Sequence, residues 1–105
     1  MITRDIIMEP NELKLVQTCD YCPEQYDVFH GNERVGYIRY RSGRFTCQPV
    51  SDGKLLNIYL LERTDESWGS IPDDKRDEWL NECKNALADF WSTIRDAEQQ
   101  LTCEG

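Results

Sequence analysis

A chain of 105 residues with 10% aromatic residues is long enough for one domain with its own core, and it does not have the composition of a disordered protein. It carries a net charge of −8, and no apolar run approaches the roughly 18 residues that a membrane span requires. Residues 1–10 also lack the pattern of a secretory signal. We therefore expect a soluble, cytoplasmic, single-domain protein that makes no contact with a membrane.

The first part of the chain gives a weak pattern and the next part a clear one. Residues 1–18 suggest at most an edge strand, and residues 19–25 look like a loop. Residues 26–61 are predicted to form a β-meander, because runs of β-forming residues alternate with turn signals. The turn signals are Gly31-Asn32, Ser42-Gly43 and Ser51-Asp52-Gly53. The last strand is predicted over Leu55–Leu61, where a nearly continuous apolar run suggests burial on both faces.

Two cysteines in the predicted loop have a spacing that zinc sites use. Cys19 and Cys22 form a C-x-x-C pair, but a zinc ribbon needs a second such pair, which the sequence lacks. These two residues are the candidates for a metal site, and a zinc-stapled interaction module stays open as an alternative. We otherwise predict no metal and no cofactor.

The hairpin at Ser42-Gly43 fixes a register that assigns side chains to faces. A two-residue loop places Arg41 opposite Arg44, Tyr40 opposite Phe45, Arg39 opposite Thr46 and Ile38 opposite Cys47. Side chains alternate across a sheet. The predicted core face therefore holds Ile38, Tyr40, Phe45 and Cys47, and the other face holds Tyr37, Arg39, Arg41, Arg44 and Thr46.

Positive charge gathers on this hairpin. The window 34–44 contains four arginines and no Asp or Glu. A guanidinium fork matches phosphate and carboxylate oxygens, and an anion bound between two opposed arginines would remove their repulsion. One hypothesis is therefore a binding protein for a nucleotide or another phosphorylated signal, with a site made of Arg34, Tyr37, Arg39, Arg41 and Arg44. The alternative is a solvated sheet face whose arginines pair with the chain's own acids.

A long helix is predicted over residues 71–97, after a loop over residues 62–70 and before a frayed tail over residues 98–105. Apolar residues recur there at three- and four-residue steps: Trp79, Leu80, Cys83, Ala86, Leu87, Phe90, Trp91, Ile94 and Ala97. Such a stripe must be covered. We predict an α+β fold, in which an antiparallel sheet of roughly three to five strands packs against this helix. Because the helix is longer than a strand, its last turns suggest a possible homodimer.

Acidic residues crowd the loop and the first turns of the helix. Residues 62–105 contain twelve Asp and Glu against five Lys and Arg. The candidate partner-binding surface consists of Asp65, Glu66, Trp68, Asp73, Asp74, Asp77, Glu78 and Glu82. It would attract a protein with a basic surface and repel nucleic acid, and a loop tryptophan is a common interface anchor. The alternative is favourable placement on the helix dipole together with solubility.

No pattern fixes a reaction. His30 is the only histidine, and no serine or cysteine motif accompanies it. The acids are numerous but unpaired for acid–base work. We therefore predict no catalytic residue and no enzymatic activity.

Three segments of the β region carry a resemblance. Residues 22–29 (CPEQYDVF), 35–41 (VGYIRYR) and 43–45 (GRF) resemble a pattern in small phage and mobile-element proteins without a settled activity. The resemblance covers residues 19–47. Where that pattern often continues with a second cysteine cluster, only Cys47 is present here, so no shared metal site is implied.

The resemblance implies a phage or prophage origin. Small acidic phage proteins often bind and block host defence or nucleic-acid-processing proteins. The leading hypothesis, by analogy at the level of the class, is thus an anti-defence inhibitor of the anti-CRISPR kind. It would act in the host cytoplasm as a DNA mimic that occupies a basic groove of a host protein.

Overall fold

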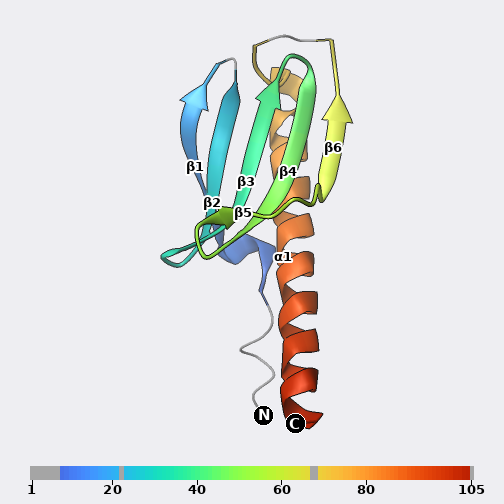
Figure 1. The fold of residues 1–105 in the computed structure, drawn as a ribbon. Helices are drawn as coiled ribbons and strands as arrows, with labels where there is room; N and C mark the ends of the chain where they lie inside the picture. The colour runs from blue at the N-terminus through green and yellow to red at the C-terminus, as the bar shows by residue number, and fades with distance from the viewer. Residues whose placement is uncertain (1–7, 22, 67–68, 105) are drawn as a thin grey trace.

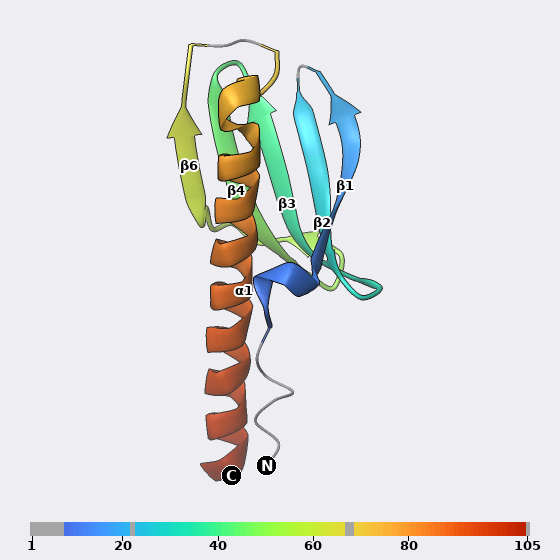
Figure 2. The same cartoon turned by 180° about the vertical axis from the view of Figure 1, so that it is seen from behind.

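A sheet and a helix form two layers. The computed structural model describes residues 8–21, 23–66 and 69–104, with side chains as far as Ile94. A six-stranded antiparallel sheet lies against one C-terminal helix (Figure 1). The view from behind shows that the helix crosses one face of the sheet and leaves the other face open (Figure 2). The predicted α+β fold class is confirmed.

The sheet is a meander in which neighbours in the chain are neighbours in space. The strands are β1 (Leu13–Asp20), β2 (Glu24–His30), β3 (Glu33–Arg41), β4 (Arg44–Ser51), β5 (Lys54–Leu55) and β6 (Leu61–Thr64). Strands β1 to β4 pair in order, and both β5 and β6 pair with β4. A 3-10 turn, η2 (Pro10–Glu12), precedes β1, and α1 (Asp73–Glu104) follows β6. Within the described ranges, no helix has the length and apolar composition for a bilayer crossing.

The β3–β4 hairpin has the predicted register. Arg41 lies opposite Arg44, and Ile38 lies opposite Cys47. Ser42 (φ 52°) and Gly43 (φ 82°) both adopt left-handed backbone conformations, which a type I′ turn requires. The turn therefore closes the hairpin tightly and places the arginines at its end.

The predicted strand over Leu55–Leu61 is wrong, because β5 ends at Leu55 and β6 begins only at Leu61. The cause lies on β4. The carbonyl of Pro49 accepts from the Leu56 N–H, but Pro49 has no N–H to return to the Leu56 carbonyl. The side-chain amide of Gln48 takes that place at 3.1 Å. The chain then leaves the sheet as a bulge over residues 56–60.

Further boundaries differ from the predictions: β1 continues to Asp20 and β2 begins at Glu24, so both strands extend into the expected loop over residues 19–25. Residues 62–70 were expected to be a loop, yet β6 occupies Leu61–Thr64. Successive side chains of this strand point to opposite faces of the sheet. Arg63 forms an ion pair with Glu82 of α1, whereas Glu62 forms one with Arg44 of β4. The helix α1 begins at Asp73 and continues to Glu104, beyond the predicted end at residue 97.

The core lies between the sheet and α1. The four residues of the predicted core face, Ile38, Tyr40, Phe45 and Cys47, are fully buried. The helix contributes Trp79, Leu80, Cys83, Leu87 and Ala88. The Trp79 ring lies 5.0 Å from that of Phe45, and the Trp91 indole N–H donates to the Val35 carbonyl at 2.9 Å. Five residues of the predicted stripe, Trp79, Leu80, Cys83, Leu87 and Trp91, thus pack against the core, whereas the side chain of Ala97 lies outside the described residues.

Close approach of the two layers requires a glycine on β3. A Cβ atom at Gly36 would lie 2.4 Å from Cδ1 of Leu87. Leu87 is itself fully buried, so its side chain has little room to move.

Candidate anion-binding site

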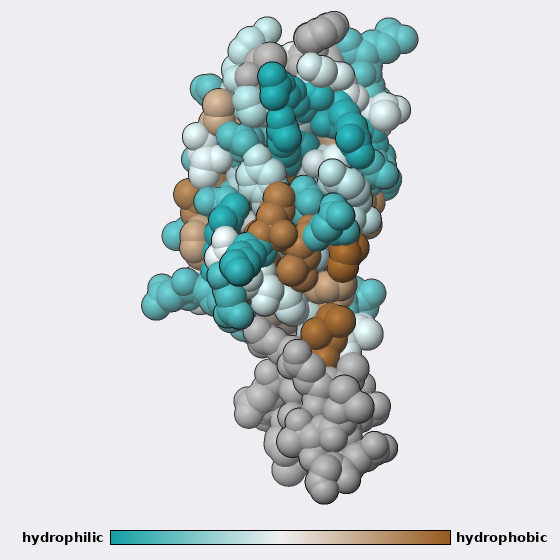
Figure 3. Space-filling view, in the orientation of Figure 1, coloured by the Kyte–Doolittle hydropathy of each residue, from teal (hydrophilic) through white to brown (hydrophobic). Residues whose placement is uncertain are grey.

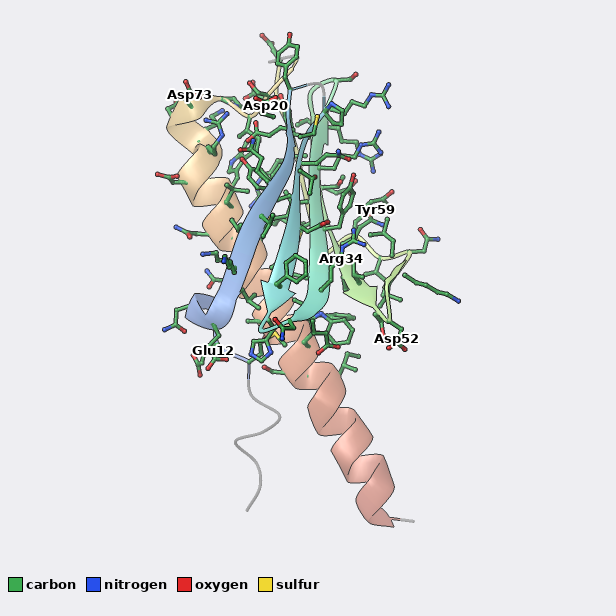
Figure 4. The ribbon with its side chains drawn as sticks, turned by 90° about the vertical axis from the view of Figure 1, so that its left-hand side faces the viewer. Glu12, Asp20, Arg34, Asp52, Tyr59 and Asp73 are labelled. Carbon is green, nitrogen blue, oxygen red and sulfur yellow. The ribbon has the colours of Figure 1, made fainter. Side chains whose placement is uncertain are left out.

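The open face of the sheet carries a hollow beside the β3–β4 turn. Its volume is about 180 Å³, and it is lined by Arg39, Arg41, Ser42, Arg44, Thr46, Gln48 and Tyr59. Six of these residues come from the hairpin, and Tyr59 comes from the bulge over residues 56–60. Tyr59 and Asp73, at the start of α1, lie on opposite sides of the sheet (Figure 4). The hollow is therefore separate from the helix.

Two arginines of this hollow have no carboxylate partner. Within the residues that the structure describes, neither Arg39 nor Arg41 takes part in an ion pair. The Nε of Arg39 is buried and has no hydrogen-bond partner in the described part of the chain. Leaving a buried donor unsatisfied costs about 1–3 kcal/mol. Arg39 is half-buried and Arg41 is exposed, so a ligand in the hollow would meet the outer parts of their guanidinium groups.

The third arginine is already engaged. Nη2 of Arg44 lies 2.5 Å from Oε2 of Glu62, and this hydrogen bond raises the pKa of the Arg44 guanidinium. The guanidinium carbon of Arg44 also lies 5.0 Å from the centroid of the Tyr59 ring. Three arginines thus face one carboxylate, and the hollow keeps an excess of positive charge.

Neutral polar groups lie beneath the arginines. Thr46 and Gln48 are among the few buried polar residues, with exposed fractions of 7% and 8%. Thr46 lies opposite Arg39 in the register, and Ser42 belongs to the turn. The lining therefore combines charged N–H donors with hydroxyl and amide groups. This is a donor set suited to an oxyanion.

The other two residues of the predicted anion site do not line this hollow. Nη2 of Arg34 pairs with Oδ1 of Asp27 at 3.0 Å, and the Arg34 guanidinium lies 5.8 Å from the Tyr37 ring. The Tyr37 hydroxyl donates to the side-chain carbonyl of Gln25, and burial raises the Tyr37 pKa. Arg34 and Tyr37 thus form a separate cluster on the same sheet, in which Arg34 has a carboxylate partner, although its Nε, like that of Arg39, has no hydrogen-bond partner among the described residues.

The predicted acidic surface is partly neutralised within the protein. Three of its carboxylates form ion pairs: Asp65 with Lys75 at 2.9 Å, Asp73 with Arg76 at 2.5 Å, and Glu82 with Arg63 at 2.8 Å. Glu66, Asp74, Asp77 and Glu78 are exposed and, within the described ranges, take part in no ion pair. Trp68 lies outside the described residues.

The cysteine pair is only partly covered by the structure. Cys22 lies outside the described residues. Cys19 is half-buried, and its thiol donates to the Tyr21 carbonyl at 3.7 Å. Among the side chains that the structure describes, no three His, Cys, Asp or Glu residues are grouped as metal ligands.

A buried ion pair on the other face was missed by sequence reasoning. Glu24 of β2 is 1% exposed and accepts hydrogen bonds from Arg76 Nε at 2.9 Å and from the Ile71 N–H at 2.8 Å. The Tyr26 hydroxyl donates to the same carboxylate. Burial alone would raise the pKa of Glu24, but these hydrogen bonds outweigh it and leave the pKa below its usual value of 4.5. The network fastens the start of α1 to β2.

The chemistry of the hollow is that of recognition by charge and hydrogen bonds. Its arginines can hold an oxyanion, and Tyr59 adds an aromatic wall.

No protein-family model, no curated protein and no solved structure matches this chain.

Proposed function

We propose that this protein is a non-catalytic binding protein whose open sheet face recognises an anionic small molecule, such as a nucleotide or another phosphorylated signal. The observation that carries this proposal is the pair Arg39 and Arg41, which have no ion-pair partner among the described residues and border one hollow.

Two electrostatic effects favour a small anion. Arg41 lies directly opposite Arg44, and because Glu62 already pairs with Arg44, the charge of Arg41 is the one that a small anion would offset. The chain as a whole carries a net charge of −8, which repels a long polyanion such as nucleic acid. A compact anion can use the local positive charge without bringing many further charges close to the acidic helix.

The test is thermal unfolding of the full chain with inorganic phosphate and with a panel of mononucleotides. A ligand present at 100 times its dissociation constant stabilises the folded state by about 2.7 kcal/mol. We expect a shift in the wild type that disappears in the double variant Arg39→Ala/Arg41→Ala. Lys84→Ala is the matched control, because Lys84 lies on α1 and makes no ion pair among the described residues.

Two outcomes would contradict the proposal. The first is that no anion shifts the unfolding temperature at millimolar concentration. The second is that the double arginine variant and the lysine control retain the same shift, which would place the binding elsewhere on the surface.

A second candidate function rests on the acidic start of the helix. We infer that Asp74, Asp77 and Glu78 would form the centre of a protein-binding surface, because they are exposed and make no ion pair among the described residues. A target with a basic groove, as for a phage-type inhibitor, has the matching charge. The carboxylates of Asp65, Asp73 and Glu82 contribute less, since cations of the same chain already face them.

Charge reversal tests this second candidate. The variant Asp74→Lys/Asp77→Lys would lose a stoichiometric, salt-sensitive partner in pull-downs from bacterial lysate. The control Glu33→Lys/Asp89→Lys changes the net charge equally at exposed positions, one at the first residue of β3 and one further along α1. Equal loss in both variants would reduce the effect to net charge and remove this function. Circular dichroism checks that both variants fold.

A further inference from the structure

We propose that the ligand of the hollow is a nucleoside monophosphate, whose phosphate lies between Arg39 and Arg41 and whose base lies against Tyr59. This rests on the proposed anion-binding function and names the class of ligand. Three features of the same site carry it: the size of the hollow, the aromatic and apolar surface beside it, and the amount of unpaired charge.

The size of the hollow limits what it can enclose. Sites that bury a drug-sized ligand have volumes of roughly 300–1,000 Å³. The hollow of about 180 Å³ is smaller, and it takes a phosphate group but not a whole ligand. The rest of a larger molecule must therefore lie across the rim, on the open face of the sheet.

The rim offers an aromatic and apolar surface on one side. Tyr59 borders the hollow and is 46% exposed, and Leu55 and Ile58, which precede it in the chain, are 47% and 45% exposed. Figure 3 looks onto this open face and shows hydrophobic side chains gathered in its middle, with hydrophilic ones above them. Exposed aromatic rings stack on the flat faces of nucleic-acid bases. The Arg44 guanidinium, 5.0 Å from the Tyr59 ring centroid, holds that ring beside the hollow.

The charge balance of the hollow favours a ligand with a single phosphate group. Arg39 and Arg41, which have no carboxylate partner among the described residues, match the two negative charges of a phosphate monoester. Each added phosphate would extend beyond them into the field of a protein with a net charge of −8. A diphosphate or triphosphate should thus bind more weakly than the monophosphate.

Calorimetric titration with a graded set of probes tests each part. The probes are inorganic phosphate, ribose 5-phosphate, AMP, GMP, UMP and ATP. We expect at least one mononucleotide to bind about tenfold more tightly than ribose 5-phosphate, and more tightly than ATP. In the variant Tyr59→Ala this tenfold gain should disappear, so that the mononucleotides bind no more tightly than ribose 5-phosphate. Tyr59→Phe keeps the ring and should keep the gain.

The outcomes separate this inference from the function on which it rests. If ribose 5-phosphate binds as tightly as every mononucleotide, or if Tyr59→Ala retains the gain, the nucleoside part is overturned and the anion site stands. If ATP binds more tightly than AMP, the monophosphate part is overturned. If Arg39→Ala/Arg41→Ala binds every probe as the wild type does, the anion site itself is wrong.

Discussion

Arginines lie on both sides of the sheet, Arg76 on α1 and Arg39 and Arg41 on the open face, and their surroundings differ. On the helix side, Arg76 donates to both carboxylate oxygens of Glu24, to Asp73 and to the Ile71 carbonyl. On the open side, Arg39 and Arg41 have no such partner among the described residues. The residue type is the same in both places, but only Arg76 finds its acceptors within the protein. An arginine with satisfied donors contributes to the fold, whereas one with open donors is available to a ligand.

Arg76→Met should have the largest effect, because it leaves the Glu24 carboxylate buried without its cation. Removing one partner of a buried ion pair typically destabilises a protein by about 3–5 kcal/mol. We expect a lower midpoint in urea unfolding at neutral pH. Lys84→Met is the control and should change stability little. A loss below about 1 kcal/mol for Arg76→Met would mean that Arg76 is as dispensable as a surface arginine.

Gly36→Ala comes next, because it tests how closely the helix packs against the sheet. The new methyl group would overlap Cδ1 of Leu87, and overpacking of this kind costs about 1–3 kcal/mol. The same substitution should cost less in a Leu87→Ala background, since the clashing atoms are then absent. A double-mutant cycle measures this difference. Additive effects would show that the two residues do not meet.

The pH dependence of stability should distinguish the two sides of the sheet, because Arg76 has a carboxylate partner, Glu24, whose pKa is lowered by folding. The pKa of Glu24 in the folded protein lies below the usual 4.5, so its stabilising contribution is present above pH 4.5 and is lost as the pH falls through the folded-state pKa. We expect Glu24→Gln to be less stable than the wild type at neutral pH. On acidification it should lose less stability than the wild type loses. Thermal midpoints measured between neutral pH and about pH 3 provide the comparison. Parallel curves for the two proteins would contradict this assignment.

Arg41→Gln should have the smallest effect and the opposite sign. It removes the repulsion between Arg41 and Arg44, and it should stabilise the unliganded protein by up to about 1 kcal/mol. The gain should fade in 1 M salt, where the screening length is about 3 Å. Destabilisation at every salt concentration would instead mean that Arg41 belongs with the structural arginines.

The hairpin could be predicted because its information is local. A two-residue turn and the period of the pleat together determine that Tyr40 and Phe45 face the core and that Arg39 and Arg41 do not. The helix was equally accessible, because its apolar residues repeat with the period of a helix. The separation of Arg34 from the anion site was not accessible, since it depends on Asp27, which lies on another strand.

Features that depend on residues far apart in the sequence could not be predicted, because no local pattern records them. Glu24 and Arg76 are separated by 52 positions, and no local pattern links them. The apolar run that begins at Leu55 reads as a buried strand, yet its pairing is broken by Pro49 on a neighbouring strand. The bulge that results brings Tyr59 to the hollow, so the aromatic part of the site lies in the segment whose structure was predicted wrongly.

The meander also determines the order in which the chain can fold. Each of the first four strands pairs with its successor, so these hairpins close short loops and lose little chain entropy. The hydrogen bond from the Met8 N–H to Ser92 Oγ, by contrast, joins residues 84 positions apart. We expect hairpins such as β3–β4 to form early and the helix to settle on the sheet afterwards. The arginine hollow, built mostly from one hairpin, would then begin to take shape before the core beneath it is sealed.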